Sequence, residues 1–145
     1  MSRLDSFIRR MQAQRDCLNM AAHMLVDIPG PALDLGLGNG RTFDHLRETM
    51  PDREVFVFDR VVTSNPKSTP DADHIFLGEA DAQLALAAER FGQTVALVHS
   101  DLGTGTSADA ALALAIAPLL VTLLRPGGVL VANNRFPADA WEELP

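Results

Sequence analysis

The chain has 145 residues, of which 47% are hydrophobic, and its formal net charge is −7. This length suits one domain with its own core, and the apolar content excludes general disorder. The acidic balance excludes a broad nucleic-acid-binding face, which needs a basic stripe, and favours a small-molecule ligand. Because Cys17 is the one cysteine, an internal disulfide and a cysteine-based zinc cluster are also excluded.

The N-terminal segment carries Arg3, Arg9 and Arg10 without an apolar core, which is not the pattern of a signal peptide. The longest apolar tract, residues 110–124, is shorter than the ~18 residues of a membrane span. It contains Pro118, so we expect a buried helix that kinks at this proline or breaks before it. The sequence therefore predicts a cytoplasmic protein with no membrane partner.

Apolar residues at helical spacing predict a first helix over residues 2–27, which the sequence Ile-Pro-Gly-Pro at 28–31 ends. Strand and helix patterns then alternate, which predicts an α/β protein with a parallel sheet and right-handed crossovers. The expected strands cover 32–35, 54–59, 74–77, 94–99 and 129–132, and the expected helices cover 42–50, 80–91 and a long segment ending near 124. A loop is expected over 62–73 and a tight turn over 125–128. We expect one domain, 1–145, with a helical lid over 1–28 and an α/β core over 29–145.

The first strand runs into a glycine-rich loop, residues 34–40, with the sequence Asp-Leu-Gly-Leu-Gly-Asn-Gly. A dinucleotide fingerprint would place its third glycine at position 41, which is arginine; here the third glycine is Gly40. The acid Asp34 would repel a pyrophosphate but attract an ammonium group. Asp59 ends the second expected strand, where a carboxylate can accept hydrogen bonds from ribose hydroxyls. Alternatively, Asp59 is an ordinary solvated acid.

Four motifs in order resemble those of the class I S-adenosylmethionine (SAM)-dependent methyltransferases, and the resemblance spans about residues 31–134. They are DLGLGNG at 34–40, VFVFDR at 55–60, LGEADA at 77–82 and LLRPGGVLV at 123–131. The resemblance implies a Rossmann-like three-layer α/β sandwich with a mostly parallel, five-stranded sheet in the order 3-2-1-4-5. It also implies SAM as the cofactor and methyl transfer as the activity.

The same resemblance assigns the cofactor-binding residues. The loop residues Gly36, Leu37, Gly38, Asn39 and Gly40 would pass beneath the methionine end of SAM, and Asp34 would help to hold its amino group. The nucleoside end would meet Asp59 at the ribose hydroxyls and, around the adenine, Arg60, Glu79 and Ala80. Asp101, at the end of the fourth strand, would lie near the reactive methyl group.

The catalytic residues stay open in the sequence. Asp101 and His99 are the candidates, with His99 either a general base or a side chain packed within the fourth strand. In metal-dependent O-methyltransferases of the catechol type, an Asp and an Asp-Asn pair hold a divalent cation. Here Asp101, Asn133 and Asn134 would correspond, but Asn133 replaces an acid, so we expect no metal.

The family's usual sheet has seven strands, whereas this chain ends after the fifth. An uncovered edge strand favours a homodimer or higher oligomer, or a shortened form of a longer sequence. We expect a small-molecule acceptor of unidentified structure. The alternatives are a non-catalytic SAM-binding or partner-binding protein of the same fold and, disfavoured by Asp34 and the glycine spacing, an NAD(P)-linked oxidoreductase.

Overall fold

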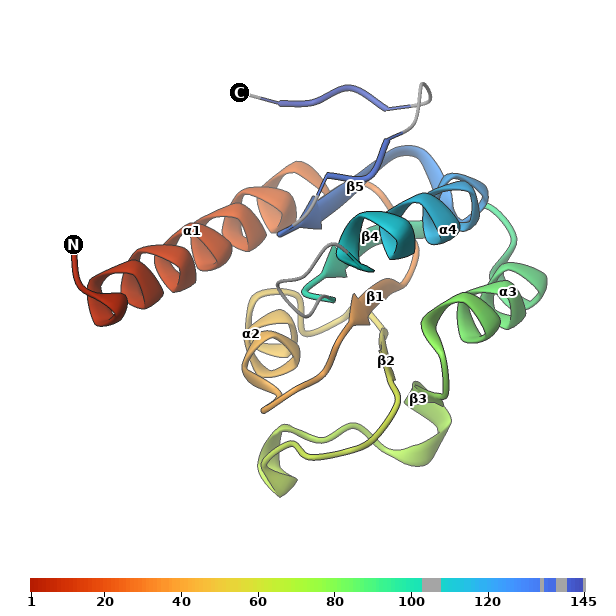
Figure 1. Ribbon diagram of the computed structural model, residues 1–145. Coiled ribbons are helices and arrows are strands. Elements are labelled where there is room, and N and C mark those ends of the chain that lie inside the picture. Colours follow the sequence, from red (N-terminus) through yellow and green to blue (C-terminus); the bar gives the residue numbers. More distant parts are fainter. Residues whose placement is uncertain (103–107, 134, 138–140, 145) are drawn as a thin grey trace.

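The computed structural model describes residues 1–102, 108–133, 135–137 and 141–144. Its centre is a parallel sheet of five strands in the order β3-β2-β1-β4-β5, which confirms the expected order (Figure 1). The strands are β1 (Ala32–Leu35), β2 (Val55–Asp59), β3 (Ile75–Leu77), β4 (Val95–Ser100) and β5 (Leu124–Ala132). Because β1 lies in the middle, between β2 and β4, the chain reverses its direction of travel across the sheet at β1, and ligands bind in the crevice at such a point.

Helices cover both faces of the sheet, as a three-layer sandwich requires. They are α1 (Arg3–Met24), α2 (Arg41–Thr49), α3 (Ala80–Phe91) and α4 (Ala108–Leu123), with short 3₁₀ helices η1 (Pro66–Ser68) and η2 (Ala72–His74) between β2 and β3. One buried cluster joins the sheet to α1 and α2, and a second joins it to α3 and α4. Every residue of β1 is buried, which matches the continuous apolar strands expected of a sheet covered on both faces.

Two local features differ from what the sequence signals. At Pro118 the alternative of a break before the proline is wrong, since α4 continues through it to Leu123. Burial of Leu120 and Leu123 beyond the proline offsets the roughly 3 kcal/mol that a proline costs inside a helix. Residues 125–128 do not precede the last strand but lie inside β5, as a bulge between the pairs Val95–Leu124 and Leu97–Val129. The sequence signals the turn at 125–128, but not that strand pairing continues on both sides of it.

The edge strand β5 is half-buried over Val129–Ala132, and the segment that follows it adds to the core on the α3–α4 side. Phe136 is buried there, and the indole of Trp141 donates a hydrogen bond of 2.9 Å to its carbonyl oxygen. An oligomer that covers this edge stays a prediction. In the part of the chain that the structure describes, no helix is long and apolar enough to cross a membrane.

His74 fastens the start of β3 to its surroundings through both ring nitrogens. Its Nδ1 lies 2.7 Å from Asp71 Oδ1 and its Nε2 lies 3.0 Å from Glu54 Oε2, and its ring stacks on Phe56. Hydrogen bonding to Asp71 and then to Glu54 raises the pKa of His74 above its ordinary 6.5, against a smaller opposing effect of burial. The hydrogen bond from His74 likewise lowers the pKa of Asp71.

This arrangement predicts a pH-dependent contribution to stability. A histidine whose pKa is raised by folding stabilises the folded state. This contribution is fully present below the pKa of the unfolded chain and is lost as the pH rises through the pKa of the folded protein. We therefore expect His74→Gln to destabilise the protein more at about pH 5.5 than at about pH 9. Urea unfolding at both pH values checks this, with His23→Gln as the control for replacing an exposed histidine. An equal loss at both pH values would contradict the assignment.

Candidate functional site

The carboxyl ends of β1 and β2 meet at Asp59, whose carboxylate reaches across to the glycine loop. Its Oδ2 accepts a hydrogen bond of 3.2 Å from the Gly38 amide, and its Oδ1 accepts one of 2.7 Å from the Arg60 amide. Asp59 is half-buried, so part of the carboxylate faces solvent beside the loop. The structure thus brings the glycine motif and the expected ribose acid into contact.

The three glycines of the loop have different reasons to be glycine. All have positive φ angles: 89° at Gly36, 51° at Gly38 and 92° at Gly40. A Cβ at Gly36 would lie 3.2 Å from the Asp101 carbonyl oxygen, and one at Gly40 would collide with the Ser68 backbone. A Cβ at Gly38 would meet nothing within 4 Å. Gly36 and Gly40 therefore allow close packing, while Gly38 leaves open space above the loop.

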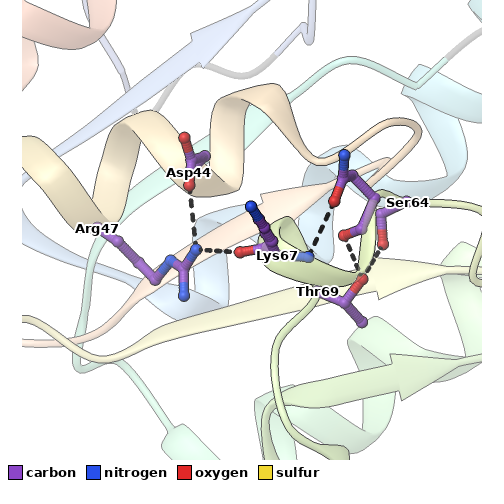
Figure 2. A network of polar contacts seen from close by, with 6 residues as sticks. Asp44, Arg47, Ser64, Lys67 and Thr69 are labelled. Atoms are coloured by element: carbon purple, nitrogen blue, oxygen red, sulfur yellow. Dashed lines mark hydrogen bonds and ion pairs between the residues drawn. The ribbon is translucent and has the colours of Figure 1, made fainter.

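Polar contacts join the long loop after β2 to the glycine loop and to α2, and Figure 2 shows the contact with α2. The Asn65 amide donates to the Asn39 carbonyl oxygen at 3.1 Å. Figure 2 shows Arg47 of α2 between Asp44 and the Lys67 carbonyl oxygen, at 3.1 and 2.9 Å. The loop expected over 62–73 is therefore tied to α2 and to the candidate site.

The residues expected around the adenine lie at the next strand ends. The Arg60 guanidinium is 3.7 Å from the Glu79 carboxylate, and both side chains are largely exposed. Glu79 caps α3, and Ala80 is the first residue of that helix. The ends of β2 and β3 therefore present an exposed ion pair beside Asp59.

Asp34 has a different environment from the one expected of a ligand to an amino group. It is 0% exposed. Its Oδ1 lies 2.8 Å from His99 Nδ1, and its Oδ2 accepts a hydrogen bond of 2.9 Å from the Thr42 hydroxyl. Direct contact of Asp34 with SAM stays a prediction, and the structure places this carboxylate between β1, β4 and the start of α2.

His99 is also buried, with 1% exposure. Of the two alternatives for His99, this agrees with a side chain packed within the fourth strand rather than with an exposed general base. Because a carboxylate oxygen only accepts, Nδ1 carries the proton that it shares with Asp34. The other ring nitrogen then accepts from Gln14 Nε2 of α1, 3.2 Å away. Gln14 and Thr42 were missed in the sequence, because nothing in the pattern around Gln14 marks it and Thr42 reads only as a residue near a helix start.

Asp101 follows β4 at the same edge, with its backbone against Gly36. Its Oδ1 accepts a hydrogen bond of 3.1 Å from Asn133 Nδ2, so the structure brings these two candidate metal ligands together through the amide nitrogen rather than its oxygen. Asn134 lies outside the described residues. Among the residues that are described, no group of three His, Cys, Asp or Glu side chains is placed to hold a metal ion.

These residues fit SAM by their chemistry. The open space at Gly38 admits a ligand against the backbone, and Asp59 offers acceptor oxygens beside it. Glu79 and Ala80 border the same edge next to β3. No described atom lies within 4 Å of the position that a Cβ on Gly38 would occupy, so the space above Gly38 is open.

Comparison with known proteins agrees with this fit. A family described as S-adenosyl-L-methionine methyltransferase matches residues 1–145. The crystal structure of an S-adenosyl-L-methionine methyl transferase from Silicibacter pomeroyi DSS-3 is similar, with 44% identity and a TM-score of 0.94. The match covers 100% of this chain and 90% of that one. A search of curated proteins finds no match. The chain therefore belongs to the S-adenosyl-L-methionine methyltransferase family, and its cofactor is SAM.

Proposed function

We propose that this protein transfers a methyl group from SAM to a small-molecule acceptor at the carboxyl edge of the sheet. The observation that carries the proposal is the position of Asp59, whose carboxylate lies against the amide of Gly38 and beside open space. When bound, SAM supplies a methyl group on a sulfonium, and the acceptor's electron pair forms the new bond as the carbon–sulfur pair returns to sulfur. The acidic chain supports a small molecule rather than a nucleic acid as acceptor.

The residues of the edge divide this work. Gly36, Gly38 and Gly40 let the backbone run close beneath the methionine end, and Asp59 accepts hydrogen bonds from the ribose hydroxyls. Arg60, Glu79 and Ala80 flank the adenine. Leu37 and Asn39 complete the loop, which the contact between Asn39 and Asn65 holds in place.

In this proposal the reaction needs little acid–base chemistry from the side chains. Both ring nitrogens of His99 have partners, so His99 positions the loop rather than removing a proton from the acceptor. Asp101 faces solvent at the end of β4 and is the carboxylate that we place nearest the methyl group. Methyl transfer from a sulfonium depends mainly on alignment, which a rigid edge of this kind provides.

Because His99 is buried and has partners on both ring nitrogens, a second candidate also has support, a protein of this fold that binds SAM without transferring its methyl group. The two differ in one result. Incubation with SAM carrying a labelled methyl group and a broad set of small acceptors yields labelled product only if the protein is a transferase. Label transferred to an acceptor would reject the second candidate.

The ribose assignment predicts that Asp59→Ala weakens SAM binding by about tenfold to a hundredfold, because two hydrogen bonds of about 1 kcal/mol each are lost. Asp59→Asn, which keeps an acceptor oxygen, should weaken it less. Calorimetric titration of each variant with SAM gives the affinities, with Asp52→Ala as an exposed acidic control. Equal affinities for the wild-type protein and Asp59→Ala would rule out the assignment.

A further inference from the structure

The first three turns of α1 project beyond the edge of the sheet where the candidate site lies (Figure 1). The second half of the helix packs on the core, where Leu18 and Ala21 are each 1% exposed. Gln14 meets His99 near the end of β4, so this level of α1 coincides with the carboxyl edge. At 1.5 Å per residue, residues 3–13 reach about 16 Å further.

The projecting part continues the face that packs on the core. Leu4, Phe7 and Met11 recur at helical spacing with Gln14 and Leu18, so all five lie on one side of α1. Beyond Gln14, however, this side is open: Leu4 is 66% exposed and Phe7 is 43% exposed. An apolar face therefore overhangs the carboxyl edge, on the same side of the helix as the sheet.

Two arginines share this overhanging face. Met1, Arg3, Leu4, Ser6, Phe7 and Arg10 line an open hollow of about 620 Å³. The Arg10 guanidinium lies 5.7 Å from the centre of the Phe7 ring, so cation and aromatic surface stand side by side. Within the described part of the chain, Arg3 and Arg10 form no ion pair.

The charge of the overhang is opposite to that of the rest of the chain. Residues 3–13 contain three arginines and one aspartate, a net charge of +2 in a chain whose total is −7. A second copy crossing helix on helix would bring these arginines against their equivalents. A bilayer beneath the same face would meet the body of the protein, which lies on that side of α1 (Figure 1). Neither occupant suits both the charge and the geometry.

Building on the proposed methyltransferase function, we propose that the overhang is one wall of the acceptor site and selects an elongated apolar molecule with an anionic group. The nucleophilic end lies beside Asp101 at the end of β4. The apolar body lies along Phe7 and Leu4, about 10 Å further out along the helix. The anionic end, a carboxylate, sulfate or phosphate, pairs with Arg10 and Arg3.

Binding of a model anion tests this without knowledge of the true acceptor. The probe is biphenyl-4-carboxylate, with biphenyl-4-carboxamide as its neutral match, each titrated calorimetrically into protein saturated with S-adenosylhomocysteine. We expect the carboxylate to bind about tenfold more tightly than the carboxamide. In Arg3→Ala/Arg10→Ala the preference should disappear, whereas Arg9→Ala, two residues and more than half a helical turn from Phe7, should keep it.

Three further measurements separate the possible failures. Titration with SAM should give the same affinity for the double arginine variant as for the wild-type protein; no SAM binding to either would overturn the proposed function rather than this inference. Phe7→Ser should lower the affinity for biphenyl-4-carboxylate, and Phe7→Leu should lower it less. The acceptor wall would be overturned if the carboxylate and the carboxamide bind equally, or if Arg9→Ala removes the preference as the double arginine variant does. A dimer in sedimentation that Phe7→Ser dissociates would also overturn it.

Discussion

Gly40→Ala is expected to destabilise the protein by about 2–5 kcal/mol and to abolish measurable SAM binding. Gly40 caps α2 with a φ of 92°, a conformation that costs an alanine about 1–2 kcal/mol. Its added Cβ would also collide with the Ser68 carbonyl oxygen and lie 2.7 Å from Ser68 Cβ. Relief would require moving the segment that carries Asn65, which is hydrogen-bonded to the glycine loop.

Gly38→Ala is the matched control for this variant, two residues away in the same loop. Its φ is 51°, but its Cβ would meet nothing within 4 Å, so the expected cost is about 1–2 kcal/mol. The new methyl group would occupy the space that we assign to SAM, so affinity should fall while the fold persists. Urea unfolding and SAM titration of both variants give the comparison. If Gly40→Ala is as stable as Gly38→Ala, the packing of this loop against Ser68 is wrong.

Asp34→Ala is expected to destabilise the protein by about 2–6 kcal/mol, at about 1–3 kcal/mol for each of the two donors that lose their acceptor. The substitution leaves the buried Nδ1–H of His99 and the half-buried hydroxyl of Thr42 without their acceptor. These groups belong to β4 and the start of α2, so the glycine loop between β1 and α2 should loosen as well.

Asp34→Asn separates geometry from charge, because its amide oxygen can still accept from His99 Nδ1 and its NH₂ can donate to the Thr42 hydroxyl. We expect it to retain more than half of the stability lost in Asp34→Ala. Thr42→Val, which removes a single partner, should cost about 1 kcal/mol. Urea unfolding of the three variants measures this order. An Asp34→Ala variant as stable as wild type would show that the buried pair does not hold the loop.

Much of the fold could be predicted because its signals are local. Strand and helix periods alternate, which predicts the parallel sheet, and the resemblance to the methyltransferases implies its order. The glycine loop and Asp59 stand at strand ends, which brings Asp59 to Gly38. The environment of Asp34 could not be predicted in the same way. Its contact with His99 depends on the register between β1 and β4, in which the two residues are direct neighbours. Its link through His99 to Gln14 depends further on how α1 crosses the sheet.

The other misses share a physical cause. Pro118 and the turn residues 125–128 carry strong local signals, but tertiary contacts outweigh them: buried leucines continue α4, and β4 resumes pairing beyond the bulge in β5. His74 gave no signal above that of a surface residue, since one of its partners, Glu54, precedes β2 and comes close only when the sheet forms. Local pattern specifies elements, whereas side-chain networks depend on their packing.

The central claim is that the carboxyl edge at the glycine loop and Asp59 binds SAM. Calorimetric titration of the wild-type protein with SAM, repeated in the presence of S-adenosylhomocysteine and with NADH in place of SAM, tests it most directly. We predict binding of one SAM per chain, displaced by S-adenosylhomocysteine, and no heat with NADH. Absence of heat with SAM at millimolar concentration, or tight NADH binding instead, would contradict the claim.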